Sequence, residues 1–201
     1  MKPTEILMQE HRVIEQVLDC LEAIVLSVEA GKELDLDSVD QSIDFFRNFA
    51  DRCHHGKEED CLFPLLEQKG FSREQGPTGV MLHEHELGRQ HVRGMAEAAR
   101  AWEAGSSSAT NGFVAHARSF VQLLRDHIQK EDHCLFQMTD QALTEQEQSQ
   151  LMESFDHVEH HDMGPGTHQK YLDIAAELAE RFGVENRLPI ASGSGGGCGH
   201  H

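Results

Sequence analysis

The 201-residue sequence is short of aromatic residues and of positive charge. Aromatic residues make up 6% of the chain, and 17 Lys and Arg stand against 35 Asp and Glu, for a formal net charge of -18. A nucleic-acid partner needs a basic face that neutralises phosphate, so this charge argues against one. No apolar run approaches the ~20 residues that a membrane-spanning helix needs, and the N-terminus has no secretory hydrophobic segment. We therefore expect a cytoplasmic protein with neither a nucleic-acid nor a membrane partner.

The sequence also lacks the cysteine pattern of a disulfide framework or of a thiolate zinc site. Its cysteines number five, an odd count, and no two of them form a Cys-x-x-Cys pair. The first four fall inside helical patterns, where buried free thiols are expected; they are Cys20, Cys53, Cys61 and Cys134.

Segments with the two-residue period of a β-strand are lacking as well, whereas the 3.6-residue period of an α-helix recurs throughout. The sequence predicts long helices over about residues 2–29, 37–67, 78–104 and 112–139, separated by segments rich in glycine, proline or serine. Long helices with short connections predict an all-α fold, an antiparallel helical bundle over residues 1–140. A C-terminal helical extension is expected over residues 141–183, and a flexible tail over residues 184–201.

One motif occurs twice, as CHHGKEEDCLF (residues 53–63) and as DHIQKEDHCLF (residues 126–136). When the two Cys-Leu-Phe triplets are aligned, His54 coincides with His127 and Glu58 with Glu131. Residues four apart share one face of an α-helix, and this alignment favours His54 and Glu58 over the neighbouring His55 and Glu59. The same faces carry the apolar stripes, so both pairs are predicted to point into the core; the stripes comprise Ala50, Cys61, Leu62 and Leu65 in one helix and Phe120, Leu123, Leu124, Cys134, Leu135 and Met138 in the other.

The first and third predicted helices each contribute a Glu-His dipeptide, Glu10-His11 and Glu84-His85. His11 shares a stripe with Leu7, Met8, Ile14 and Leu18, and His85 shares one with Met81, Leu82, Gly88 and Val92. The step from the Glu-His histidine to the His-x-x-x-Glu histidine is 43 residues in the first half (54 - 11) and 42 in the second (127 - 85). The chain is therefore predicted to be a duplicated helical hairpin that brings four histidines and two glutamates to one level of the interior.

These six residues predict a metal site. A single core histidine or glutamate is usually held by hydrogen bonds alone, but two carboxylates buried near four imidazoles would be very unfavourable without a cation. The donor set suits two ions, each bound by two histidines and both bridged by each glutamate; iron fits best, and manganese or zinc less well. Four protein ligands leave a six-coordinate iron with room for an oxo or hydroxo bridge and one exogenous ligand.

With these motifs, HHxxEExxLFP and Glu-His-x-x-x-Arg among them, the sequence resembles the hemerythrin-like (HHE cation-binding) domain over about residues 3–140. The resemblance implies an up-down-up-down four-helix bundle around a non-haem di-iron centre. It implies terminal ligands and two bridges at the residues named above; the terminal ligands are His11, His54, His85 and His127, and the bridges are Glu58 and Glu131.

The sequence departs from the oxygen-carrying hemerythrins in the third helix, where those proteins have a second histidine four residues from the first. Here the two positions four residues from His85 hold Met81 and Arg89. Either both irons keep an open position or another residue fills the gap; the candidates are Glu59, Glu159 and His168.

The leading hypothesis is a di-iron protein that binds or senses O2 or a related ligand (NO or peroxide), with Glu10 and Glu84 orienting the histidines. Tyr171, three residues after His168, could hydrogen-bond a bound oxygen species if the extension covers the site. One alternative is a di-iron enzyme of oxidative or nitrosative stress defence, peroxidase-like or an iron donor for repair. The other is a structural or metal-storage bundle. The residues leave open which alternative holds, and they identify neither the electron donor nor the oligomeric state.

Overall fold

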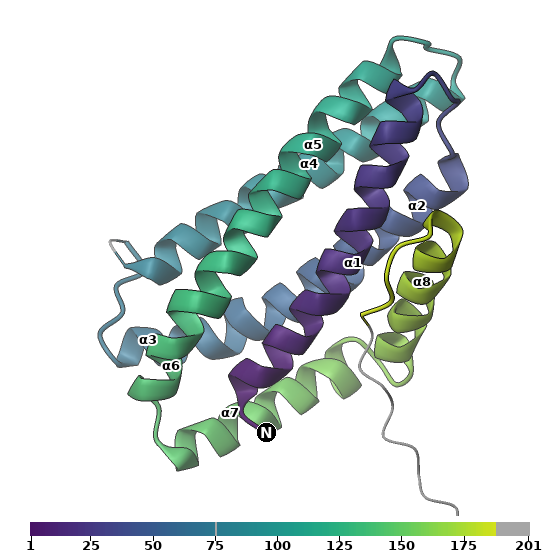
Figure 1. Cartoon of the computed structure of the whole chain (residues 1–201). Helices are drawn as coiled ribbons and strands as arrows, with labels where there is room; N and C mark the ends of the chain where they lie inside the picture. Colours follow the sequence, from purple (N-terminus) through teal and green to yellow (C-terminus); the bar gives the residue numbers. More distant parts are fainter. Residues whose placement is uncertain (75, 188–201) are drawn as a thin grey trace, which may run out of the picture.

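The protein is all-helical in a computed structural model that describes residues 1–74 and 76–187 (Figure 1). Four helical runs lie along the long axis of the molecule: α1 (Pro3–Glu29), α2 (Leu36–Phe45) to α3 (Phe63–Gln68), α4 (Pro77–Glu103), and α5 (Ala109–Lys130) to α6 (Phe136–Ala142). The described residues contain no strand, and none of their helices is long and apolar enough to cross a bilayer. The predicted all-α class is confirmed. Most of the predicted flexible tail, residues 188–201, lies outside the described residues.

Helix boundaries follow local signals in the sequence. Pro3 and Pro77 lie in the first turns of α1 and α4, where a backbone N–H would have no helical partner. Asp35 caps α2 by accepting a hydrogen bond from the Ser38 N–H (3.2 Å). Gly31 and Gly70 follow α1 and α3 with φ of 85° and 93°, a left-handed conformation that terminates a helix at little cost only for glycine.

Two of the helical runs change to π-helix where they pass the His-x-x-x-Glu motifs. The second run does so over η1 (Phe46–His55) and η2 (Lys57–Leu62), and the fourth over η3 (Glu131–Leu135). In a π-helix each N–H bonds to the carbonyl five residues earlier, so the turn holds more residues than an α-turn; such turns are rare and frequently mark functional sites. Face assignments that assume 100° per residue are therefore less accurate in and after these segments.

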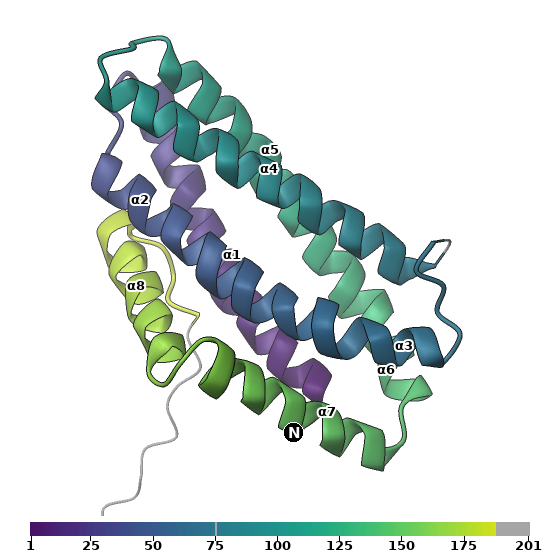
Figure 2. The same ribbon diagram turned by 180° about the vertical axis from the view of Figure 1, so that it is seen from behind.

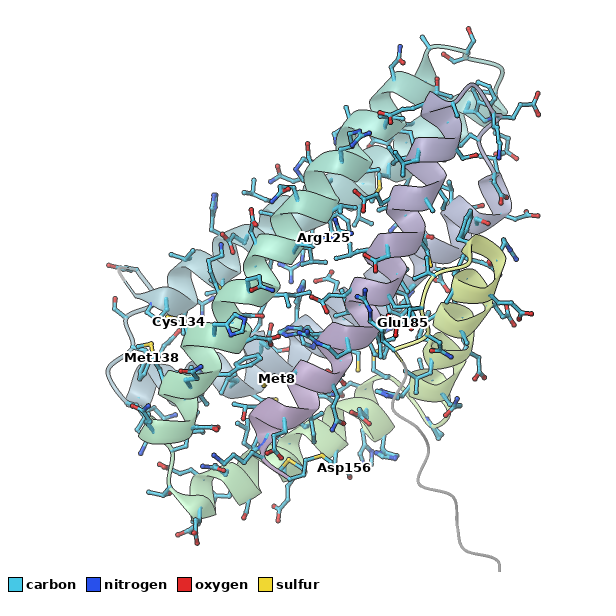
Figure 3. All side chains as sticks on the ribbon, viewed as in Figure 1. Met8, Arg125, Cys134, Met138, Asp156 and Glu185 are labelled. Carbon is cyan, nitrogen blue, oxygen red and sulfur yellow. The ribbon has the colours of Figure 1, made fainter. Side chains whose placement is uncertain are left out.

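The buried stripe predicted for the fourth run is wrong at its C-terminal end. Cys134 and Met138 lie on the outer side of the run, exposed to solvent (Figure 3). Asp132 and Phe136 are buried instead. The wider turn of η3 rotates the residues that follow it relative to a regular α-helix.

Met8 is exposed as well, although the sequence analysis places it on the buried stripe of α1. Leu7 occupies the buried face there, and the next residue of an α-helix is turned away from it by about 100°.

The C-terminal extension packs against the bundle through both of its helices. Helix α7 (Glu145–His157) continues into η4 (Val158–Asp162) and crosses the end where α1 begins, while α8 (Thr167–Phe182) lies beside α1 and α2 (Figures 1 and 2). Thr144 forms a capping box with Glu147 at the start of α7. Phe155 and Leu178 are both buried in hydrophobic clusters shared with the bundle, so the extension completes the core.

A polar layer divides the apolar interior into two clusters. The larger cluster begins at Val13 in α1 and the smaller one contains Leu7, so His11 lies between them. The same order holds in the second run, where His54 and Glu58 lie between Ala50 and Leu62. In the other two runs the layer is formed by His85, His127 and Glu131.

Candidate metal centre

The structure brings the six predicted donor residues into one buried layer. Each is at most 1% exposed; they are His11 from α1, His54 from η1, Glu58 from η2, His85 from α4, His127 from α5 and Glu131 from η3. Helical spacing explains their convergence, because each His-x-x-x-Glu motif places its histidine and glutamate one turn apart on the inward side. Four helical runs thus supply donors to one site.

Each of the two glutamates lies between histidines of different hairpins. The Glu131 Oε2 atom is 3.3 Å from His11 Nε2 and 3.2 Å from His127 Nε2. The Glu58 carboxylate places Oε1 3.6 Å from His54 Nε2 and Oε2 3.4 Å from His85 Nε2. Two carboxylates that span two pairs of imidazoles have the arrangement of bridging ligands.

Five donor atoms of this layer lack hydrogen-bond partners. Within the described residues, both carboxylate oxygens of Glu58, both of Glu131, and His11 Nε2 are buried without any. The Nε2 atoms of His85 and His127 face one another at 3.1 Å. Buried polar atoms are normally paired, and leaving a charged group unpaired costs several kcal/mol. A bound cation would satisfy all of these atoms together, so the residues fit a metal centre.

Every one of the four histidines donates its Nδ1–H to a carboxylate from a neighbouring helical run. The four pairs are His11 with Asp132 (2.7 Å), His54 with Glu10 (2.9 Å), His85 with Glu59 (2.7 Å) and His127 with Glu84 (2.9 Å). These hydrogen bonds fix the tautomer that leaves Nε2 free to bind a metal, and they make the imidazole a stronger ligand. Glu10 and Glu84 lie where the sequence analysis predicts them, whereas it missed Asp132, the residue that follows Glu131.

The protonation of the layer is uneven. Burial, together with the nearby charge of Glu131, raises the pKa of Glu58 well above its ordinary value. Burial lowers the pKa of His54 to about 4 despite its bond to Glu10. Burial lowers the pKa of His127 too, but Glu131 and then Glu84 outweigh it and raise the pKa to about 9. Protons therefore balance the charge of the layer when no metal is bound.

A lysine precedes the glutamate in both copies of the motif and contacts the carboxylate that orients a histidine. Lys57 binds Glu10, and its counterpart Lys130 binds Glu84. The Lys57 side chain is fully buried, because η4 covers it with Glu159, whereas the Lys130 side chain is 42% exposed. The extension thus makes the two halves of the repeat unequal.

His55, which the sequence analysis set aside, also reaches the layer. It is 6% exposed, and its ring stacks on that of His85 with centroids 3.8 Å apart. Ligand atoms of His55, Glu58, His85 and His127 all lie within 4.8 Å of one another, as do those of His11, His54, Glu58 and Glu131. The sequence feature that points to His55 is the His54-His55 doublet. In a regular α-helix the two side chains would lie on different faces, so only His54 was predicted to face the core.

The other candidate residues lie around the layer. Glu59 accepts from His85 and also from Arg89 (2.6 Å). Glu159 binds Lys57, and His168 belongs to a separate group with Glu10 and Cys53.

The phenol of Tyr171 donates to Asp44 Oδ2 (3.2 Å), and its ring packs on Phe45 in the larger hydrophobic cluster. Its hydroxyl is therefore engaged beside α2, whereas the hypothesis from the sequence was a hydrogen bond to a bound oxygen species if the extension covers the site.

The cysteines differ in their environment. Burial raises the pKa of Cys20 and of Cys53 to about 12, so both thiols are protonated at neutral pH. Cys61 is half-buried and Cys134 is exposed. The expectation that the first four cysteines are buried free thiols is therefore wrong for Cys134.

Two small pockets flank the layer. One, of about 180 Å³, has the buried His55 and His85 in its wall together with apolar side chains such as Phe46 and Phe120. The other, of about 120 Å³, lies between α1, η4 and α8 and is lined in part by Glu10 and Phe49. Either pocket has room for a small ligand.

Comparison with known proteins agrees with this geometry. The family model described as the hemerythrin HHE cation binding domain matches residues 2–139. Uncharacterized proteins of Mycobacterium bovis and Mycobacterium tuberculosis are each 24% identical to the chain over 180 residues, which cover 90% of this chain and 70% of theirs. No solved structure matches the chain significantly.

Proposed function

Since this chain belongs to the hemerythrin HHE cation-binding family, we propose that it holds two iron ions and binds or senses O2 or a related small ligand, NO or peroxide. Residues 2–139 would form an antiparallel up-down-up-down four-helix bundle around the two ions. The four runs that lie along one axis in Figures 1 and 2 support this topology.

The observation that carries the proposal is the set of unpaired donor atoms. Both oxygens of Glu58 and of Glu131 are buried without hydrogen bonds among four imidazoles that each offer Nε2. Carboxylates and imidazoles without thiolates suit iron or manganese, and they suit zinc less specifically. Each glutamate lies between a histidine of the first hairpin and a histidine of the second, and this arrangement favours a pair of ions over a single one.

When bound, a pair of ferrous ions supplies electrons and open coordination positions for a small ligand. The residues of the chain would hold the ions, orient their ligands and exclude water. Glu58 and Glu131, both buried between histidines, would hold the ions together and balance their charge. The carboxylates on Nδ1 keep the imidazoles oriented. The apolar clusters on either side of the layer exclude water from it.

Iron content and reactivity test the proposal. Protein purified without chelator is expected to hold about two irons per chain, the number that the donor set suits. After anaerobic reduction, exposure to air should produce the charge-transfer bands of an oxidised, bridged iron pair. A colourless protein with stoichiometric zinc and no response to air or azide would refute the proposal and leave a structural or storage role.

The same sample separates reversible binding from turnover. An adduct that forms with O2 or NO and dissociates under vacuum supports binding or sensing. Repeated consumption of peroxide or NO in the presence of a reductant supports the stress-defence enzyme instead.

A further inference from the structure

One of the two donor groups in the polar layer contains three histidines. His55, His85 and His127 gather around Glu58, whereas the other group contains only His11 and His54 with both glutamates. The first group therefore offers one more imidazole than the repeated motif provides.

His55, like the four motif histidines, has a carboxylate at its Nδ1 atom, although this carboxylate comes from its own helix. Its Nδ1 lies 3.3 Å from Asp51 Oδ1, so a carboxylate holds this ring as carboxylates hold the others. Asp51 accepts in turn from Arg89 Nε at 2.9 Å. Arg89 stands four residues after His85, one of the two positions where an additional histidine was expected from the resemblance. Arg89 thus helps to position, through Asp51, the imidazole of His55, which comes from another helix.

The π-helical backbone accounts for two adjacent inward histidines. In a regular α-helix His54 and His55 would point about 100° apart, and only one could face the layer. Both lie at the end of η1, where the wider turn directs more side chains to one side. The repeat identifies His55 as an addition, because its counterpart after His127 is the buried, apolar Ile128.

We propose that His55 is a fifth histidine ligand and makes the metal pair unequal. It would complete the ion held by His85 and His127, while the ion held by His11 and His54 keeps the open position. The inference rests on the proposed metal pair and deepens it, because it states which ion the small ligand reaches. The pocket between α1, η4 and α8, which borders Glu10 beside His54, lies on the side of that open ion.

The test replaces His55 in two ways. His55→Ile introduces isoleucine, the residue found at the equivalent position of the second hairpin, Ile128. His55→Phe keeps a ring to stack on His85 but removes the ligand nitrogen. His83→Ile, at an exposed histidine of α4, is the matched control.

Mössbauer spectra of iron-57 protein, with iron content and azide binding, give the readout. The wild type should show two different iron environments of equal weight. Both His55 variants should abolish that difference or bind one ion about tenfold or more weakly, the size of effect that lost ligand support produces. The His83→Ile control should match the wild type.

Each other outcome decides between the two proposals. Unchanged spectra and iron content in both His55 variants would overturn the assignment of His55 and leave the di-iron function standing. A normal His55→Phe with a defective His55→Ile would overturn it too, since stacking would then be the role of the ring.

If the wild type binds cobalt or zinc but no iron, the proposed function fails. The visible spectrum of the cobalt form, compared between wild type and His55→Phe, would then still decide the ligand assignment. A wild type that binds no divalent ion would overturn both proposals.

Discussion

Replacing the buried Lys57 by methionine tests how the charges around the metal layer are balanced. Lys57 contacts Glu10, which accepts from His54 Nδ1, and both side chains are almost completely buried. Burial would raise the pKa of Glu10, but the charge of Lys57 and the hydrogen bond from His54 lower it to about 2. Lys57→Met preserves the length of the side chain and leaves Glu10 with an uncompensated charge.

The expected loss of stability is about 3 kcal/mol, the lower end of the cost of breaking a buried ion pair from one side. We take the lower end because Glu10 keeps its bond to His54, and because Glu159 is 25% exposed and can turn to water. One kcal/mol shifts the melting temperature of a chain of this size by about 2–4 °C, so 3 kcal/mol corresponds to about 6–12 °C.

Thermal and denaturant unfolding, each in the metal-free and the metal-loaded protein, measure the loss. Lys130→Met is the matched control, because Lys130 forms the equivalent ion pair with Glu84 but its side chain is 42% exposed. It should cost less than about 1 kcal/mol, as exposed ion pairs do. Adding Glu10→Gln to Lys57→Met should restore most of the stability, since glutamine still accepts from His54 without a charge.

Two results would refute this reasoning. If Lys57→Met and Lys130→Met lowered the stability equally, burial by the extension would not matter to the pair. If the double variant were as unstable as Lys57→Met, the loss would come from packing rather than from the charge of Glu10.

Three further predictions concern metal, protons and thiols. Glu131→Gln removes one of the two spanning carboxylates, so elemental analysis should find about one metal per chain where the wild type holds about two. Because Glu131 raises the pKa of His127 to about 9 against the effect of burial, a proton must leave when metal binds, and chelator competition should show affinity falling as the pH drops below about 9. Iodoacetamide should modify the exposed Cys134 but not the buried Cys53 in the folded protein, as mass spectrometry of a Cys198→Ser variant would show.

Each of these has a result that contradicts it. Glu131→Gln protein with both metals would mean that this carboxylate does not bridge. An affinity that stays constant between about pH 6 and 9 would mean that His127 is neutral before metal binds. Equal labelling of Cys53 and Cys134 would show that η1 opens in solution.

Much of the donor set could be read from spacing alone. The alignment of the two Cys-Leu-Phe triplets selects Glu58 and Glu131, and the Glu-His dipeptides select His11 and His85. An α-helical period predicted these inward positions, because α1 and α4 are regular and the paired residues of each motif lie one turn apart. The same rule failed at Cys134, since η3 is not α-helical.

The partners of the histidines could be predicted only in part. Glu10 and Glu84 were expected because they adjoin metal-facing histidines. Glu59 and Asp132 directly follow the two glutamates of the motifs. Glu59 accepts a hydrogen bond from His85 and Asp132 accepts one from His11, and in both pairs the histidine belongs to another helical run. Which carboxylate reaches which imidazole depends on how far apart and how rotated the helices are, and these quantities have no period in the sequence.

The sequence by itself determined the helical class, the two-fold repeat and the level at which six donors meet, because these follow from spacing along single helices. Only the tertiary structure decided that each glutamate spans the two hairpins, that His55 joins the layer and that the extension buries Lys57 but not Lys130. The physical reason is that these features depend on the π turns and on contacts between segments distant in the chain. A regular helical period describes neither of them.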